Sequence, residues 1–478
     1  MSKKNFSKKK KQKILFLTAY NEALKSFIPL LDSLDKIYDV YVINEYLPSG
    51  PDKKKNSFIL KKFNGKLVKS FELLEQPQNR LGAGSKSRWY RLYQIFLKGI
   101  LYEIKADKKA KQIINQIRPD LFINSGDGRT LPKHMIKYCD KKNIRSICYQ
   151  WTIGIISKKL VTEYKLNSYS FQKEKFLKKI ENKIFSYAFK FVNKFNGLIL
   201  TIINKKAKLN LKTKNNFTVF GQGNSTKLAL IGKSSRKFYI DMGTNATKLE
   251  VLGHPLYESI YNNIHSIKKK IIKKSIYKKF DLPKSAKIIL WAFGDAKIQY
   301  SKFYNDEFMF ASFKEKLITI LNTNSDIYVF FKIHPNRDKI FDYKKLEKIS
   351  PRIKVVDIDL LEILPISLIL MVRCSMSAIN AIIFNIPTIS FNYPPIGLDN
   401  FYKYLGGTFH VQNNEELKKT IQKLLNKDDH MINLLKKKRN TFLIKNLNIN
   451  PKNKKRRNEN ISILNFKKLI NKLLKNEK

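Results

Sequence analysis

The chain carries two successive series of short apolar runs, and segments of helical periodicity separate the runs within each series. The candidate strands of the first series are 13–19, 38–44, 119–124, 144–150, 197–202, 217–221 and 248–253, and those of the second are 286–292, 326–333, 352–357, 367–372, 387–391 and 407–411. Continuously apolar runs of this length are typical of strands that are covered on both faces. Strands that alternate with helices form parallel sheets through right-handed crossovers. The pattern therefore predicts an α/β fold of two doubly wound domains, with a ligand cleft at the carboxyl ends of the strands.

The length of 478 residues agrees with two domains, because so long a chain does not usually fold around a single hydrophobic core. The boundary is expected near "GHPLYESI" (253–260), which precedes a basic helical segment and a new apolar run. We expect a basic N-terminal tail (1–12), an N-terminal domain (13–256), a C-terminal domain (257–435) and a basic C-terminal tail with an amphipathic segment (436–478).

Lysine and arginine outnumber aspartate and glutamate by 94 to 38, which gives a net charge of +56. Nucleic-acid binding would explain this excess. So would the Lys, Asn and Ile bias of an AT-rich genome, or a protein that rests on an anionic membrane face and handles anionic substrates. The basic residues are dispersed, and no RRM, KH or helix-turn-helix pattern is present, so we expect no specific nucleic-acid partner.

The cysteines and apolar runs indicate the compartment. Cys139, Cys148 and Cys374 show no CxxC spacing, which favours a reducing environment. The first apolar run, "ILFLTAY" (14–20), is too short for a signal peptide, and no run is long enough to span a bilayer. We expect a cytoplasmic protein that is peripheral on the inner face of the cell membrane.

Two segments, 171–195 and 461–475, place apolar residues at helical spacing with lysines opposite. Such a helix either packs its apolar side on its own domain or rests on a membrane surface. Packing is the favoured interpretation of 171–195, whereas the sequence does not choose between the two for 461–475.

A cation and an imidazole follow one strand of the second series. In "FFKIHP" (330–335), the predicted strand 326–333 leads into Lys332 and His334. One interpretation is a strand that simply stops at a proline. The other is an anion site, because the carboxyl end of this strand belongs at the ligand cleft.

A second group of polar residues follows the predicted strand 367–372. The turn contains Arg373, Ser375 and Ser377 and precedes the helical segment "AINAIIF", so one of the two serines is expected to be the N-cap. A capping serine alone says nothing of function. A guanidinium, two hydroxyls and a helix N-terminus, combined with Lys332 and His334 in one sheet, would neutralise a phosphate leaving group without a metal.

Two further strand ends carry candidate residues. In "WAFGDAK" (291–297), Gly294 would let the backbone approach a ligand and Lys297 would reach a phosphate, although a glycine after a strand is usually only a turn. In "INSGDGRT" (123–130), Asp127 is either a base for an acceptor hydroxyl or part of an Asp-Gly turn. His134 is a reserve candidate for the base.

The chain presents "YQWTIG" (149–154), "VLGHPLYESI" (251–260), "FFKIHP" (330–335) and "RCSMSAINAIIFNIPTISF" (373–391) in this order. This order resembles that of GT-B glycosyltransferases of bacterial surface-polysaccharide synthesis. Capsule glycosyltransferases and teichoic-acid glycerophosphotransferases show a similar Lys-x-His-Pro motif and a similar serine-containing turn. "GHPL" is similar to the interdomain segment of lipid A disaccharide synthase, and "GDG", "HP" and "SMS" are similar to motifs of bacterial sialyl- and polysialyltransferases.

The resemblance implies a GT-B fold of two Rossmann-like domains that face a cleft, with a nucleotide held by the C-terminal domain. It further implies transfer of a sugar from a nucleotide-activated donor to a cell-surface polysaccharide or glycolipid, with no cofactor and no metal. Asp127 and His334 are the expected catalytic residues. A nucleotide-sugar 2-epimerase and a CDP-glycerol-type glycerophosphotransferase have related architectures and remain alternatives, as does a basic nucleic-acid-binding protein.

Overall fold

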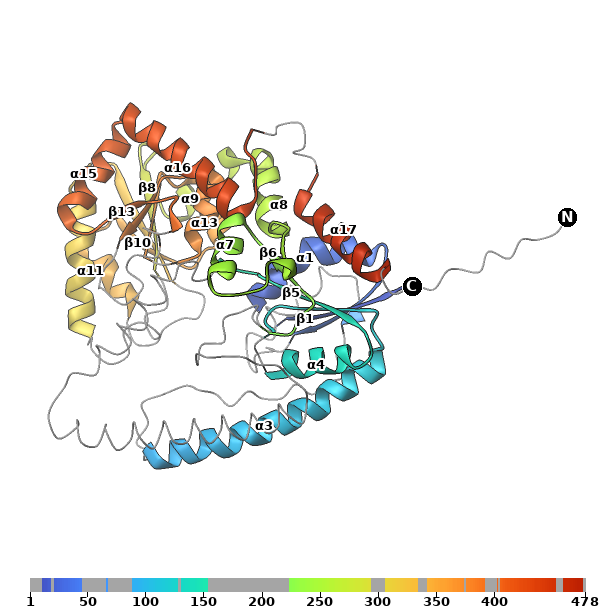
Figure 1. The fold of residues 1–478 in the computed structure, drawn as a ribbon. Coiled ribbons are helices and arrows are strands. Elements are labelled where there is room, and N and C mark those ends of the chain that lie inside the picture. The colour runs from blue at the N-terminus through green and yellow to red at the C-terminus, as the bar shows by residue number, and fades with distance from the viewer. Residues whose placement is uncertain are drawn as a thin grey trace.

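The computed structural model of the chain describes residues 11–18, 21–44, 66–67, 88–127, 130–153, 223–293, 306–333, 342–373, 375–391, 402, 405–452 and 459–475. Within these residues the strands form two parallel sheets, one of seven strands and one of six, and helices pack around both (Figure 1). The predicted α/β fold with two doubly wound parallel sheets is therefore confirmed.

The first sheet has the strand order β3-β2-β1-β4-β5-β6-β7, and all its neighbouring strands are parallel. The elements of this half are β1 (Lys13–Thr18), α1 (Asn21–Asp35), β2 (Asp39–Asn44), β3 (Lys66–Leu67), α3 (Arg88–Ile117), β4 (Leu121–Asn124), α4 (Thr130–Asp140), β5 (Arg145–Tyr149), β6 (Lys227–Leu230), α7 (Lys233–Asp241), β7 (Leu249–Val251) and α8 (Pro255–Asn263).

The second sheet has the order β10-β9-β8-β11-β12-β13 and is also parallel throughout. Its elements are α9 (Lys269–Lys279), β8 (Lys287–Ala292), α11 (Asp306–Leu321), β9 (Ile327–Lys332), β10 (Ile353–Val356), α12 (Leu360–Ile363), β11 (Ile369–Val372), α13 (Ser377–Phe384), β12 (Thr388–Phe391), β13 (Phe409–Val411), α15 (Asn414–Leu425) and α16 (Asp429–Leu447). The last helix, α17 (Ile461–Lys475), packs on the first sheet.

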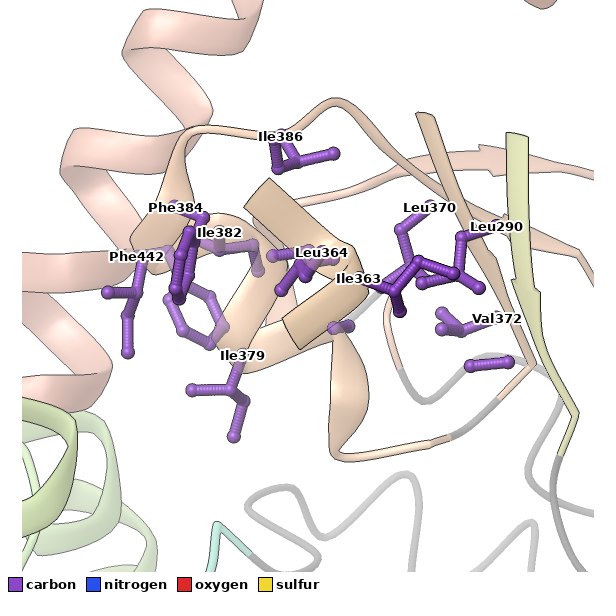
Figure 2. Close-up of a cluster of buried hydrophobic side chains, with 14 of the residues drawn as sticks. Leu290, Ile363, Leu364, Leu370, Val372, Ile379, Ile382, Phe384, Ile386 and Phe442 are labelled. Carbon is purple, nitrogen blue, oxygen red and sulfur yellow. The ribbon is translucent and has the colours of Figure 1, made fainter. Parts of the chain in front are cut away.

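Successive residues of a central strand belong to different hydrophobic cores, which explains why the apolar runs do not alternate with polar residues. In β8, Ile288 and Leu290 belong to the core shared with α13 and α16, whereas Ile289 and Trp291 belong to the core shared with α11 and α15. Figure 2 shows side chains of α13, α16 and the strands converging in the first of these cores.

The chain returns to the first sheet at its C-terminal end. Phe466 and Ile470 of α17 are fully buried in the core that β1 shares with α1, and Leu469, Leu473 and Leu474 of the same helix join them. The helix predicted over 461–475 is confirmed, but the apolar side that a membrane would have to receive is occupied by the first sheet. Residues 436–447 and 461–475, which we expected in a basic tail, are helical and packed on the two sheets.

Most predicted strands are present with bounds that differ by one or two residues at the ends. Strand β6, in "KLALIG", was not predicted; its leucine and alanine residues favour helix as much as strand. The predicted strands 197–202 and 217–221 and the predicted amphipathic helix 171–195 lie outside the described residues. No described helix is both long enough and apolar enough to cross a membrane.

Candidate functional site

Each sheet reverses its strand order at one point, and a crevice for a ligand belongs at the carboxyl ends of the strands there. In the second sheet, β8 is the first strand of the series, and it lies between β9 and β11. The strand that follows β8 in the chain lies on one side of it, and the later strands extend from its other side. A ligand of this sheet is therefore expected to contact the residues at this edge.

The register of the second sheet places several polar residues in one row at this edge. Ala292 at the end of β8 is opposite Lys332 of β9 and Val372 of β11, and Val372 is in turn opposite Ser390 of β12. Ser390 is opposite His410 of β13. Residues that are opposite one another in a sheet point to the same face, and neighbouring strands are about 4.8 Å apart. Lys332 thus lies roughly 10 Å from the end of β11.

The turn after β11 contains the predicted arginine and serines. Ser375 Oγ accepts a hydrogen bond from the backbone N–H of Ser377 at 3.2 Å and donates to Ser377 Oγ at 2.9 Å. The N-cap of α13 is Met376, without a capping side chain, so the prediction of a serine N-cap is wrong. Ser375, one position before the N-cap, instead accepts the hydrogen bond from the N–H of Ser377, the first residue of the helix.

A tyrosine that the sequence did not single out holds this turn. Tyr402, which is 2% exposed, donates a hydrogen bond through its hydroxyl to the carbonyl of Ser375. The two residues are far apart in the chain, and no local pattern links them. Ser375 and Ser377 themselves are half-buried, so their hydroxyls are held in place but are not enclosed.

Several positively charged groups lie at this edge. Arg373, which is 5% exposed, brings a guanidinium to the end of β11. The N-terminus of α13 adds backbone N–H groups and the positive end of a helix dipole. Lys332 is half-buried at the end of β9. The structure thus brings Lys332, Arg373, Ser375 and Ser377 to one edge of one sheet.

Three predicted residues of this edge, Gly294, Lys297 and His334, lie outside the described residues. The strands that lead to them, β8 and β9, end at the expected edge. The roles of these three residues stay predictions.

Asp127 lies beyond the carboxyl end of β4 in the first sheet, as expected, but its side chain is only 2% exposed. Gly223 lies directly against it, since a Cβ at Gly223 would be 2.7 Å from the Asp127 Cγ. Burial raises the pKa of the Cys148 thiol well above its ordinary value, and the neighbouring charge of Asp127 raises it further. The carboxylate therefore faces the buried thiol of β5. Its role as a base stays a prediction.

His134 is part of a charged network between α3 and α4. Its ring nitrogens lie 2.8 Å from Glu103 Oε2 and 3.0 Å from Asp107 Oδ1, and the side chain is 2% exposed. Burial alone would raise the pKa of Glu103, but the hydrogen bond with His134 and the charge of Lys133 hold that pKa below its usual value. The imidazole of His134 thus links α4 to α3. His134, the reserve candidate for the base, therefore has a structural role.

Polar groups at the carboxyl edge of the first sheet bond to one another. Asn124 Nδ2 lies 3.4 Å from Ser225 Oγ, and its Oδ1 accepts from the N–H of Gly126 at 3.0 Å. Gln150 Oε1 accepts from the N–H of Ile231 at 3.2 Å, which ties the end of β5 to the end of β6.

The "GHPLYESI" segment holds α17 against the first sheet. Glu258 is buried and accepts hydrogen bonds from the N–H groups of Ile461 and Ser462 at 3.0 and 2.7 Å and from the Ser462 hydroxyl at 2.6 Å. Gly253 has a φ of +90°, and a Cβ there would lie 2.2 Å from Ser462 Oγ. The segment that resembles an interdomain motif therefore has a structural role that the sequence did not reveal.

His254 caps α8 within the same segment. Its Nδ1 accepts from the N–H of Tyr257 at 3.2 Å, and its Nε2 lies 3.1 Å from the Trp151 carbonyl oxygen. Burial lowers the pKa of His254 from 6.5 to about 4, against the effect of the carbonyl of Trp151. His254 is therefore neutral at ordinary pH and links the end of β5 to α8.

Sequence reasoning also missed a cluster of three polar residues at the second edge. Ser390 Oγ lies 3.0 Å from Thr408 Oγ1 and 3.2 Å from His410 Nδ1. His410 shares the register row and the sheet face of Lys332. The available signal was a histidine inside the predicted strand 407–411, because a strand that is buried on both faces does not require a titratable side chain.

A metal site needs several ligands in one place. Among the residues that the structure describes, no three His, Cys, Asp or Glu side chains gather in a way that would hold a metal ion. Independence from metals and cofactors stays a prediction.

No protein-family model and no curated protein matches the chain. Solved structures do resemble it. The UDP-GlcNAc 2-epimerase from Neisseria meningitidis, bound to UDP-GlcNAc, is 12% identical with a TM-score of 0.55, and the match covers 98% of this chain and 100% of that chain. The glycosyltransferase from Rickettsia africae is 13% identical with a TM-score of 0.53 over 98% and 100% of the two chains. The glycotransferase of kitacinnamycin is 11% identical with a TM-score of 0.55 over 91% and 95%.

At these identities the likeness establishes the fold. The chain has the GT-B fold of two Rossmann-like domains, and its structural neighbours are enzymes of that fold, both glycosyltransferases and UDP-GlcNAc 2-epimerases.

Proposed function

We propose that the protein is a glycosyltransferase that moves a sugar from a nucleotide-activated donor to a cell-surface polysaccharide or glycolipid. The observation that carries the proposal is the cationic and hydroxyl-bearing edge of the second sheet, where Lys332 and the turn of Arg373, Ser375 and Ser377 lie around the strand-order reversal. A diphosphate is the anion that this combination of guanidinium, ammonium and helix N-terminus suits.

In the proposed reaction, an acceptor hydroxyl oxygen bonds to the anomeric carbon while the bond from that carbon to the phosphate oxygen breaks. The bonding electrons leave with the nucleotide, so negative charge grows on the departing phosphate. Arg373 and the N–H groups at the start of α13 would stabilise that charge more strongly than they stabilise the intact donor, which is how such groups accelerate a reaction. Lys332 and His334 would act on the same phosphate from the other side of β8.

The proton of the acceptor hydroxyl needs a base, and Asp127 remains our candidate. It follows a strand of the other sheet, where an acceptor would approach. Its burial beneath Gly223 means that this role requires the loop over the carboxylate to move. The proposed reaction requires no metal and no cofactor.

A nucleotide-sugar 2-epimerase is the second candidate function. The structure of the Neisseria enzyme, which was solved with UDP-GlcNAc, matches almost the whole chain and favours this alternative. An epimerase changes the donor sugar itself and needs no acceptor.

A panel of UDP-, GDP-, CMP- and CDP-activated compounds tests the proposal first by thermal shift, because a ligand that binds only the folded state raises the melting temperature. The compound that binds is then incubated with the protein alone and with glycan or glycolipid acceptors. Transfer that needs an acceptor supports the transferase, whereas a changed sugar without acceptor supports the epimerase. A shift with CDP-glycerol alone would replace both with a glycerophosphotransferase.

The variant His334→Ala tests the phosphate site from the β9 side. We expect turnover to fall about a hundredfold, as for other lost contacts to a developing charge. A folded variant with full turnover would remove His334 from the mechanism.

We propose a cytoplasmic location on the inner face of the membrane. The net charge of +56 supports it, because the cytoplasmic leaflet is anionic.

A further inference from the structure

The surface around α9 is strongly one-sided in charge. Between positions 268 and 287 the chain has one acidic residue, Asp281, and nine exposed lysines: Lys268, Lys269, Lys270, Lys273, Lys274, Lys278, Lys279, Lys284 and Lys287. Lys287 pairs with Asp326 at 3.7 Å. Within the described part of the chain, the lysines of α9 itself have no carboxylate within ion-pair distance, so their charge is not neutralised locally.

An apolar side chain stands in the middle of these lysines. Ile271 is 62% exposed, more than any other large apolar residue of the described chain. The opposite side of α9 packs on the domain through Ile276, which is 7% exposed. Ile271 is thus not needed to hold the helix in place, and its exposure to water is unfavourable.

A hollow of about 860 Å³ adjoins Ile271. Its lining includes the apolar side chains of Ile264, Ile267 and Phe384, together with the basic residues Lys268 and Arg439. Arg439 also bonds to the carbonyl oxygens of Ile382 and Ile383 at the end of α13, so its guanidinium has a fixed position. The lining of the hollow therefore combines apolar side chains with positively charged ones.

We propose that this surface, formed by α9 and the adjoining hollow, docks the protein on an anionic lipid bilayer. The lysines contact the phosphate headgroups, Ile271 enters the boundary between headgroups and acyl chains, and the hollow receives the apolar part of a lipid. Charge complementarity selects this partner, because a helix with lysines around an exposed aliphatic residue has the chemistry of an interfacial helix. The inference does not rest on the proposed transferase activity.

Vesicle sedimentation with the full chain tests the proposal, using phosphatidylcholine vesicles with and without phosphatidylglycerol at low salt. We expect binding only to the anionic vesicles. The variant Lys269→Glu with Lys270→Glu should bind at least about thirtyfold more weakly. The matched control is Lys418→Glu with Lys419→Glu on α15, an exposed lysine pair on another helix, and its binding should stay near that of the unaltered protein.

The apolar contribution is tested separately with Ile271→Glu, which should weaken vesicle binding about tenfold. Its matched control is Ile318→Glu on α11, where the isoleucine is 38% exposed. Equal binding of all variants, or equal binding to neutral vesicles, would overturn the proposal. So would release from vesicles by a short RNA together with tight RNA binding that only the α9 variants lose. The vesicle experiments contain no sugar donor, so their results do not depend on whether the protein is a transferase.

Discussion

Both sheets reverse their strand order at one point, but the polar groups at their carboxyl edges are used differently. At the edge of the first sheet, Asn124 bonds to Ser225, Gln150 bonds to the backbone of β6, and Asp127 lies buried beneath Gly223. At the edge of the second sheet, a guanidinium and two half-buried hydroxyls occupy a single turn beside the strand-order reversal.

The difference indicates a division of work between the two halves. Asn124, Gln150 and Glu258 bond within the first half, so these side chains stabilise the fold and the return of α17. At the second edge, Lys332 and Arg373 follow strands on either side of β8, where we propose that a phosphate binds. We therefore expect the proposed nucleotide to bind the second half, and mutations at the two edges should have different consequences.

The largest expected effect is on turnover, at the second edge. Arg373→Ala should lower donor-dependent turnover about a hundred- to a thousandfold, because it removes a fixed charge from the site where negative charge develops. Steady-state kinetics with the donor identified by the panel measures it. Arg145→Ala, at the amino end of β5, is the matched control and should keep full activity. Unchanged turnover of the Arg373 variant would end the proposed role of this edge.

At the first edge, His254 should make stability depend on pH. Its pKa is about 4 in the folded protein and about 6.5 in the unfolded chain. Below pH 6.5 the unfolded chain takes up a proton that the folded state does not, so the free energy of unfolding falls as the pH falls from about 6.5 to about 4, by roughly 3 kcal/mol in all. Denaturant titrations across this range measure the slope.

The variant His254→Asn keeps a capping side chain but does not titrate, so its slope should be smaller than that of the unaltered protein. His265→Asn, at an exposed histidine, is the control and should leave the slope unchanged. A slope that survives in the His254 variant would mean that another group is responsible.

Asp127→Asn tests whether the first edge also contributes to chemistry. If Asp127 is the base, turnover should fall about a hundredfold while the affinity for the donor is unchanged. Parallel measurement of turnover and of donor binding separates the two quantities. Full turnover would show that the carboxylate only supports the loop of Gly223.

The smallest expected effect concerns the attachment of α17. Glu258→Ala leaves the N–H groups of Ile461 and Ser462 without their carboxylate and should cost about 2 kcal/mol of unfolding free energy. Glu459→Ala, at an exposed neighbouring position, is the control and should cost much less. Equal losses in chemical denaturation would contradict a specific role for Glu258.

The fold was predictable from the sequence because strands that are buried on both faces of a sheet appear as continuous apolar runs. It failed at β6, where "LALI" satisfies helix and strand preferences alike. It also did not distinguish a membrane helix from a packed one at 461–475, because both present the same apolar spacing; only the neighbouring surface of β1 and α1 decides between them.

The sequence predicted where the polar residues lie in the sheet, but not their contacts, and their role as a site stays a prediction. Arg373, Ser375 and Lys332 follow strands of one sheet, and parallel topology alone brings such residues to one edge. The contacts of Tyr402 with Ser375 and of Glu258 with Ser462 join distant parts of the chain, and no local pattern reveals them.

The most direct test of the division of work is amide hydrogen exchange with and without UDP, and with GDP and CDP for comparison. The account predicts that the nucleotide which binds slows exchange in residues 372–379, at the turn and the start of α13, and leaves residues 121–127 unchanged. Protection confined to residues 121–127, or no protection at 372–379 with a nucleotide that raises the melting temperature, would contradict it.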